Sequence, residues 1–246
     1  GIAAELERMA NHIGDLGAMA GDVGFLPTMS YCGRIRGDVL NMTALICGNR
    51  FGRGLIVPGG TAWDIDPSMI KELLDRLKTV EQDATSAVEL MFNTPSVLAR
   101  FENIGVVNRE TAEAIGLVGP AARASGLVRD VRNNFAYGIY RYFAVSTFTW
   151  HTGDCFARAY IRWVEVLESI RFIRTLLQSF PAGAIRLPLE VNLPEEKCTV
   201  ILGDGWRGEI CHMAVTDTQG KFAFYKVVDP SFHNWNGLAM SLRDTG

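Results

Sequence analysis

The sequence predicts a mainly α protein, in which a multi-helix bundle of long helices carries a small antiparallel β-sheet near the C-terminus. Three observations predict this class: apolar residues at spacings of three and four, Gly- and Pro-rich breaks between the periodic stretches, and short β-rich segments after residue 198. The 246 residues are 48% hydrophobic and 21% charged, which is typical of a globular chain with a sizeable core. We expect a helical core over 1–183 with a mixed insert at about 96–150, and a β appendage with the start of a C-terminal helix over 184–246.

The first two helices are predicted from apolar spacing. Between Leu6 and Val23 apolar residues recur every three or four positions, which predicts a helix near residues 2–24. After a break around Pro27, the stretch RIRGDVLNMTALICGNRF reads as a second helix that ends at Gly48 or soon after. A glycine-rich turn follows it.

Two more long helices have clear start or stop signals. Asp66 and Pro67 predict the start of a helix near 68–92, because aspartate is a favoured N-cap and proline fits the first helical turn. A further long helix near 154–180 is expected to stop at Pro181, which cannot continue it.

The remaining segments are shorter. The insert at 96–150 is predicted to contain a short helix at 109–117 and loops around 119–120 and 125–126. Between residues 198 and 228, the segments CTVILG, GEICHMAVTD and KFAFYKVVDP alternate with turn signals, which predicts the small antiparallel sheet.

The polar face of the first predicted helix carries a row of ionisable residues at helical spacing. Small residues such as Gly14 and Gly17 lie between them, so the row is expected to face something other than water. One interpretation is that its members simply pair with one another, as charged residues three or four apart on helices often do. Asp22 has no cation at helical spacing and is therefore the better candidate for a functional acid. The row consists of Glu5, Arg8, His12, Asp15 and Asp22.

Three predicted turns carry arginines that are candidate site residues. The stretch GNRFGRGLIVPGG at 48–60 holds Arg50 among glycines that let a ligand or another chain approach, but it lacks the Gly-Lys-Ser/Thr ending of a phosphate loop. In RASGLVRDVR at 123–132, arginines surround Asp130, and the spacing alone favours a solvated turn with an internal ion pair. Arg207 lies on a tight turn before a strand, where a structural role and an anion-clamping role are equally expected.

Composition and spacing disfavour several classes of site and partner. A net charge of −3, with Lys and Arg scattered along the chain, gives no basic patch for nucleic acid. No apolar run approaches the roughly 20 residues of a membrane span. The five cysteines form no C-x-x-C pair, which argues against a metal motif. Cys155 follows Asp154 and His151, but without an oriented base these three residues do not make a catalytic triad.

Five stretches in a common order resemble one family: the large subunit of nickel-iron hydrogenases of the membrane-bound, formate hydrogenlyase type, and its homologue, the 49-kDa-type subunit of respiratory complex I. ELERMANHIGDLGAMAGDVG is similar to the family's E-x-x-R-x-x-N-H helix, and GNRFGRGLIVPGG to the segment that ends in P-G-G. RASGLVRDVR resembles R-x-S-G-x-x-x-D-x-R, and GDCFARAYIRWVEVLESI resembles G-D-x-x-x-R-x-x-x-R-x-x-E-x-x-x-S. GWRGEI resembles the P-R-G or P-K-G turn.

The resemblance implies catalytic roles for four residues. In the family the helical bundle encloses a catalytic cavity, so the polar row with Glu5 and His12 is expected to face a cavity or a partner chain. Asp22 matches an aspartate of the quinone cavity that is proposed to couple to protons in complex I relatives. Arg207 matches an arginine beside the nickel-iron centre of hydrogenases. We expect Asp22 to be at least partly buried.

The resemblance also implies an iron-sulfur partner subunit. Arg50 matches an arginine near the terminal iron-sulfur cluster of that small subunit. We expect the partner to cover the face around Arg50, Arg123 and Arg132, with Asp130 beside the last two. Membrane subunits are expected to associate indirectly, and nucleic acid is not expected to bind.

The chain departs from the family pattern in two respects. Complex I relatives have a histidine two residues after the Arg50 position and an arginine just before P-G-G, where this chain has Gly52 and Val57. Its closing stretch, DPSFHNWNGLAMSLRD, looks more like the hydrogenlyase branch. Hydrogenases hold nickel and iron with two C-x-x-C motifs; neither is present here, and we expect both ends to be truncated.

The expected function is therefore that of a core fragment of the large subunit of a hydrogenase-type oxidoreductase, in which electron transfer is coupled to proton handling. The alternatives are a complex I 49-kDa-type NADH:quinone oxidoreductase subunit and a metal-free structural homologue that docks an iron-sulfur subunit. No cofactor is expected in this fragment, although a nickel-iron centre is compatible with the full-length parent and an iron-sulfur cluster with a partner. The expected location is cytoplasmic, peripheral to the inner membrane through partner subunits.

Overall fold

The computed structural model describes residues 1–189 and 192–243 and divides the chain into two compact units. The first unit comprises Gly1–Ile104 and Asp154–Leu187, and the second comprises Gly105–Gly153 and Pro188–Gly246. The mainly α class with a small antiparallel sheet near the C-terminus is confirmed. The grouping differs from the expected boundary at residue 183, since residues 105–153 belong with the C-terminal part and not with the long helices.

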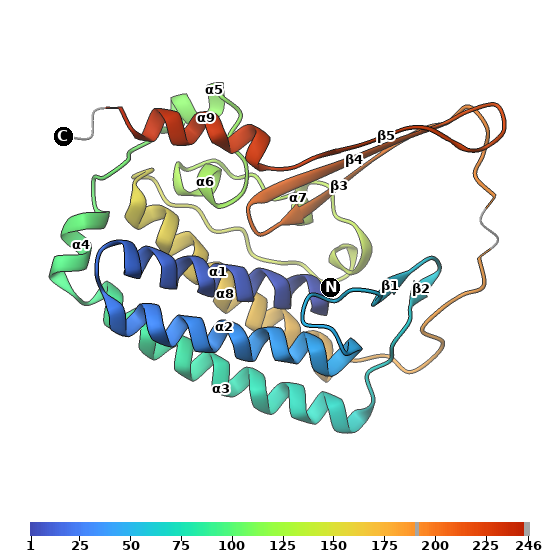
Figure 1. Ribbon diagram of the computed structural model, residues 1–246, viewed down its shortest axis with the longest axis horizontal. Coiled ribbons are helices and arrows are strands. Elements are labelled where there is room, and N and C mark those ends of the chain that lie inside the picture. Colours follow the sequence, from blue (N-terminus) through green and yellow to red (C-terminus); the bar gives the residue numbers. More distant parts are fainter. Residues whose placement is uncertain (190–191, 244–246) are drawn as a thin grey trace. The chain divides into compact units, whose positions relative to one another are not determined.

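The first unit is built on four long helices, which lie side by side in Figure 1. The short helix α4 and a two-stranded hairpin complete the unit. The long helices predicted near 2–24, 68–92 and 154–180 are confirmed to within two residues at each end. The elements are α1 (Ile2–Asp22), α2 (Leu26–Cys47), β1 (Ile56–Val57), β2 (Gly60–Thr61), α3 (Pro67–Phe92), α4 (Pro95–Phe101) and α8 (Cys155–Gln178).

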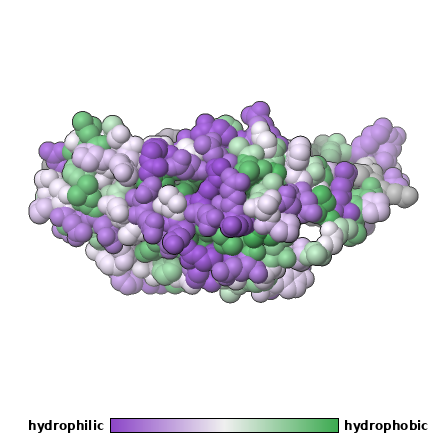
Figure 2. Space-filling view, turned by 90° about the horizontal axis from the view of Figure 1, so that it is seen from below, coloured by the Kyte–Doolittle hydropathy of each residue, from purple (hydrophilic) through white to green (hydrophobic). Residues whose placement is uncertain are grey.

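Amphipathic patterning places these helices around one apolar core. In α3, Leu73, Leu77 and Val80 are buried, whereas most of the charged residues between them are exposed. The face seen from below in Figure 2 is largely hydrophilic, with apolar side chains scattered over it. As the sequence predicted, Asp66 caps this helix: its Oδ1 accepts a hydrogen bond from the backbone N–H of Met69 at 2.8 Å.

The glycines of α1 face α2. A Cβ atom added to Gly17 would lie 2.8 Å from the Cβ of Cys32, and one added to Gly21 would lie 2.6 Å from the Sδ of Met29. Both distances are too short for a real contact, so the small residues allow α2 to approach α1 closely. The polar row of α1 lies on another side of the helix, against α8.

Two predicted breaks are helix starts in the structure. The break expected around Pro27 is the first turn of α2, which begins at Leu26. The loop expected around 119–120 is the start of α6, whose first residues are Gly119 and Pro120. In both cases proline occupies a position whose N–H would have no helical partner, so it begins the helix instead of breaking it.

The second unit combines short helices with the predicted sheet, which has the strand order β3-β4-β5 and is antiparallel throughout. Gly119 of α6 explains why the middle of the chain groups with the sheet, because a Cβ there would lie 2.3 Å from the carbonyl oxygen of Arg207 at the β3–β4 turn. The elements are α5 (Arg109–Ala114), α6 (Gly119–Ala124), α7 (Val131–Asn134), a 3₁₀ turn (Gly138–Arg141), β3 (Cys198–Gly205), β4 (Gly208–Thr216), β5 (Phe222–Val228) and α9 (Ser231–Ser241).

Within the described ranges, none of the helices combines the length and the apolar composition that a membrane span needs.

Candidate functional site

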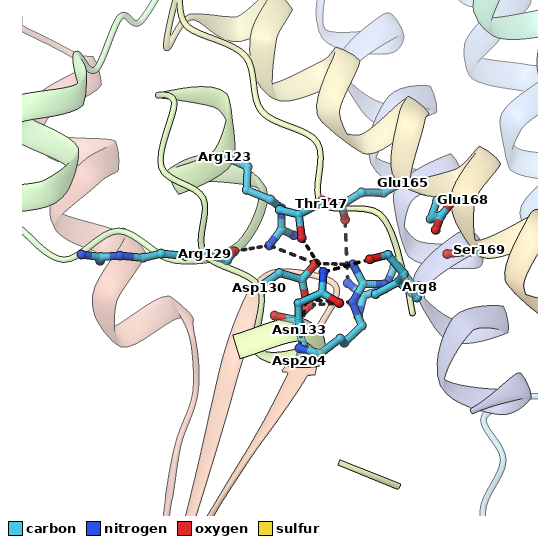
Figure 3. Close-up of polar contacts among 12 residues, drawn as sticks. Arg8, Arg123, Arg129, Asp130, Asn133, Thr147, Glu165, Glu168, Ser169 and Asp204 are labelled. Atoms are coloured by element: carbon cyan, nitrogen blue, oxygen red, sulfur yellow. Dashed lines mark hydrogen bonds and ion pairs between the residues drawn. The ribbon is translucent and has the colours of Figure 1, made fainter. Parts of the chain in front are cut away.

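The first unit contains a buried polar cluster between α1 and α8, which we call the α1–α8 cluster. Its members are Glu5, Arg8 and His12 on α1 and Glu165 and Ser169 on α8, and each side chain is at most 2% exposed. The Nε of Arg8 donates to Glu5 Oε2 at 3.2 Å, and Ser169 Oγ donates to the same oxygen at 2.6 Å. Arg8 Nη1 also lies 3.8 Å from Glu165 Oε2 (Figure 3). The first three residues of the polar row, Glu5, Arg8 and His12, therefore face a second helix and not water.

His12 on α1 lies at hydrogen-bond distance from Glu165 on α8. Its Nε2 lies 2.8 Å from Glu165 Oε2, whereas its Nδ1 is buried and has no hydrogen-bond partner among the described residues. Burial lowers the pKa of the His12 imidazole, and the hydrogen bond to Glu165 opposes this effect without reversing it. The neutral imidazole is therefore favoured at pH 7, with one ring nitrogen acting as donor and the other as acceptor.

Burial along the polar row decreases toward the C-terminus of α1. Asp15 and Arg162 pair at 3.0 Å with their side chains 29% and 20% exposed, and Asp22 is exposed. The expectation that Asp22 is partly buried was wrong. The pairing of residue 12 with 165 and of 15 with 162 places Asp22, the last residue of α1, level with the first residues of α8, where the packed surface between the helices ends.

The second unit contains a buried cluster of two arginines and two aspartates, which we call the Arg–Asp cluster. It consists of Arg123, Asp130, Arg132 and Asp204. Arg132 donates to both carboxylate oxygens of Asp130, from Nε to Oδ1 at 3.0 Å and from Nη2 to Oδ2 at 2.7 Å. Arg132 Nε also lies 3.7 Å from Asp204 Oδ2. Arg123 Nη1 lies 4.0 Å from Asp130 Oδ2 and donates to the carbonyl oxygen of Arg129 at 2.7 Å (Figure 3).

The expectation of a solvated turn at 123–132 was half right. The internal ion pair is present, but Arg123, Asp130 and Arg132 are each at most 2% exposed. They are therefore not available in this structure as an open surface for a partner. Asp130 also accepts the backbone N–H of Arg132 at 3.0 Å, so it fixes the first turn of α7 as well as the guanidinium.

A pocket of about 360 Å³ lies beside the Arg–Asp cluster within the second unit. Asp130 and Asp204 contribute to its wall together with Arg129, Glu209 and His233. The His233 Nε2 and a Glu209 carboxylate oxygen are 4.0 Å apart. Exposed Phe135 also lines the pocket, so its wall combines both charge signs with an aromatic ring.

The remaining predicted site residues lie outside both clusters. Arg50 and Arg207 are exposed, Arg50 on the turn after α2 and Arg207 at the β3–β4 turn. Of the predicted catalytic set, the structure brings together Glu5 and His12, but not Asp22. The roles assigned to these residues stay predictions.

Three cluster members were not among the predicted site residues: Glu165 and Ser169, which are fixed positions of the motif matched by GDCFARAYIRWVEVLESI, and Asp204. The first two carry a signal, because Arg162, Glu165 and Ser169 lie three and four residues apart and so share one face of α8. Asp204 carries none, since a single aspartate near a strand end resembles any turn residue.

Among the described residues, no three His, Cys, Asp or Glu side chains lie close enough to hold a metal ion. The cysteines are dispersed over the elements, with Cys32 and Cys47 both buried on α2. In the sheet Cys198 lies opposite Val215, and Cys211 lies opposite Leu202. Cys198 and Leu202 are four residues apart along β3, so the two thiols are not neighbours across the strands. Neither pair of thiols converges.

The chain is similar to known proteins over nearly its whole length. The model of a family described as the respiratory-chain NADH dehydrogenase 49-kDa subunit matches residues 22–200. An NADH-quinone oxidoreductase subunit of Clostridium beijerinckii is 30% identical over 95% of this chain and 63% of its own length. The carbon monoxide-induced hydrogenase of Rhodospirillum rubrum is 28% identical over 96% of this chain and 66% of its own length.

A solved structure of the membrane-bound sulfane sulfur reductase, described as an archaeal respiratory membrane complex, contains a chain of the same fold. The TM-score is 0.84 at 20% sequence identity, over 98% of this chain and 71% of that one. The curated relatives are longer, and the present chain spans about three fifths of the length of the C. beijerinckii protein, with 63% covered.

Proposed function

We propose that this chain, which belongs to the family of the respiratory-chain NADH dehydrogenase 49-kDa subunit, is the central part of a subunit of a membrane-associated oxidoreductase complex that reduces quinone. The observation that carries the proposal is the family match over residues 22–200. The matched residues include Arg123, Asp130 and Arg132 of the Arg–Asp cluster. They also include Glu165 and Ser169 of the α1–α8 cluster. Of the two branches that the sequence left open, the quinone oxidoreductase branch is the better supported, and the hydrogenase branch expected first is the less supported.

The buried clusters support a role in moving protons. Quinone reduction consumes protons as well as electrons, and buried carboxylates with histidine at hydrogen-bond distance are groups that bind and transfer protons. The α1–α8 cluster provides such groups in the first unit. We propose Glu5 and His12 for this role, and we retain Asp22 as a candidate at the exposed end of the same helix.

A hydrogenase is the second candidate function. It is favoured by the similarity to the carbon monoxide-induced hydrogenase of R. rubrum and by Gly52 and Val57 at the two positions where complex I relatives carry histidine and arginine. The residues that flank this chain in the complete gene discriminate the two. Two C-x-x-C pairs there would favour the hydrogenase. Their absence together with a β-hairpin histidine would favour quinone reduction, and the absence of both would favour a metal-free structural subunit.

The direct test uses the full-length parent, tagged in its host and purified with its partner subunits. We expect quinone reduction with NADH or another reduced carrier, and no hydrogen uptake by the same preparation. The control is an identically treated strain in which the gene is deleted. Hydrogen uptake with stoichiometric nickel, without quinone reduction, would replace the proposal with the hydrogenase.

An iron-sulfur partner subunit and a peripheral position at the membrane belong to the same proposal. Because Arg123 and Arg132 are buried, Arg50 is the one arginine of the three that is exposed for contact. We expect Arg50→Glu to weaken co-purification of the partner or to lower the reduction potential of its cluster, because the substitution reverses a charge near it. The exposed Arg53, on the same turn, gives the matched control variant Arg53→Glu.

A further inference from the structure

We propose that His12 and Glu165 form a proton relay, in which Nδ1 of His12 receives a proton and Nε2 passes one to Glu165. The inference deepens the proposed function and relies on it only for the relay's part in turnover. Two observations carry it. His12 Nε2 lies 2.8 Å from Glu165 Oε2, and the buried Nδ1 has no hydrogen-bond partner among the described residues.

The transfer that we propose balances on this pair of side chains. In the neutral imidazole that donates to an ionised Glu165, the proton is on Nε2 and Nδ1 carries a lone pair. A proton that enters the pair forms the N–H bond at Nδ1, after which the Nε2–H bond breaks and an O–H bond forms on Glu165. The imidazole ends neutral, with its proton on Nδ1. No electron moves, and the incoming proton is supplied by water.

The pair can hold the added proton in two ways, and in both of them Nδ1 carries a proton. Whether the pair holds it as an imidazolium beside a carboxylate, or as a neutral imidazole beside a carboxylic acid, Nδ1 is protonated. Within the part of the chain that the structure describes, Nδ1 has no hydrogen-bond partner, so its lone pair is open to a proton that comes from outside the pair. The structure thus separates a receiving atom from a delivering atom on one ring.

The charged groups around the pair define its surroundings. Arg8 on α1 and Arg162 on α8 act on the imidazole and favour its neutral form, while Glu165 favours the charged form. Burial is the largest influence and lowers the pKa of His12. The imidazole of His12 is therefore neutral at pH 7 and can accept a proton at Nδ1.

The route to solvent follows the same two helices. Asp15 lies three residues after His12, Arg162 lies three residues before Glu165, and these two side chains pair at 3.0 Å while partly exposed. They form the nearest opening of the helix interface along the polar row. Water that enters beside this pair is one helical turn from the ring of His12.

The test is infrared spectroscopy on the purified complex that contains the full-length parent, recorded after a rapid drop in pH. We expect the C=O band of a protonated carboxylic acid to appear and Glu165→Gln to abolish it. His12→Gln keeps an N–H donor near Glu165 but cannot accept a proton, so it should slow the appearance of the band at least about tenfold. Thr28→Val, which removes another buried hydrogen bond of the first unit, should leave both band and rate unchanged.

Each result decides the proposal. The absence of a Glu165 band, or a His12→Gln complex that loads as fast as the unaltered one, overturns the relay. If the His12→Gln complex does not assemble, the unaltered complex is measured in D₂O. A relay that breaks an N–H bond should then protonate Glu165 more slowly than in H₂O. An unchanged rate would contradict the relay. The infrared measurement requires no turnover, so a complex that shows the band but does not reduce quinone contradicts the proposed function and leaves the relay intact.

Discussion

Asp130 shows how much a single residue's role depends on distant parts of the chain. The sequence predicted an internal ion pair of Asp130 with the arginines around it, and in the structure Arg132 is a partner. The burial of Asp130 does not follow from spacing, because the enclosing strand β3 and Asp204 come from much later in the chain. For the same reason the sequence could place Glu5 and His12 in one row but could not identify Glu165 as their partner.

Replacing Asp130 tests the strength of this buried arrangement. We expect Asp130→Asn to lower the free energy of unfolding by about 3–5 kcal/mol, because it removes the carboxylate that accepts two hydrogen bonds from the buried guanidinium of Arg132. The matched control is Asp83→Asn, which breaks the exposed contact between Asp83 and Arg34 and should cost less than about 1 kcal/mol. Denaturant unfolding followed by circular dichroism measures both. Equal losses would show that burial of Asp130 contributes nothing.

The pH dependence of stability reports on His12. Its pKa is lower in the folded state than the ordinary value of 6.5, so below about pH 6.5 the unfolded chain binds more protons at this site than the folded one. Stability therefore falls as the pH decreases through this range, by up to about 1.4 kcal/mol per pH unit from this group. His12→Gln should remove that slope, measured as the difference between the two unfolding curves at pH 5 to 8. An identical slope in the variant would contradict the buried, neutral imidazole.

At the scale of elements, the sequence predicted the long helices because periodicity and caps are local signals. Asp66 capping α3 and the end of α8 near Pro181 are examples. The starts of α2 and α6 were missed because proline at the first helical turn and proline in a loop look alike in sequence. The grouping of α5–α7 with the sheet was missed because it depends on the backbone contact of Gly119 with the β3–β4 turn.

The contact between α1 and α2 can be tested with two glycines. Gly17→Ala introduces a Cβ 2.8 Å from the Cβ of Cys32, so the helices must separate, and we expect a loss of about 1–3 kcal/mol. Gly33→Ala on α2 has no atom within 4 Å of its new Cβ and should gain about 0.5–1 kcal/mol, because alanine is the better helix former. The midpoints of thermal unfolding should therefore shift in opposite directions. Shifts of the same sign would contradict the close approach of the two helices at Gly17.

At the scale of the whole molecule, we expect these 246 residues alone to bind no nickel, iron or cluster. Cys32 and Cys47 are separated by four turns of α2, and burial raises the pKa of the Cys32 thiol to about 11, which disfavours the thiolate that a soft metal needs. Elemental analysis after expression with both metals supplied, together with a hydrogen-uptake assay, measures this. Stoichiometric metal in the folded protein would overturn the expectation.

The first unit is assembled from two stretches of chain, and this has a consequence for its synthesis. His12 and Glu165 are 153 positions apart, and α8 follows all of residues 105–153. While the chain emerges from the ribosome, α1 to α4 are synthesised before α8. Until α8 is synthesised, Glu5, Arg8 and His12 are in contact with water, and the apolar face beside them is not covered. Closure of so distant a contact is slow relative to local helix formation. We therefore expect the nascent chain to expose this apolar face, as a surface that chaperones can bind, until α8 leaves the exit tunnel.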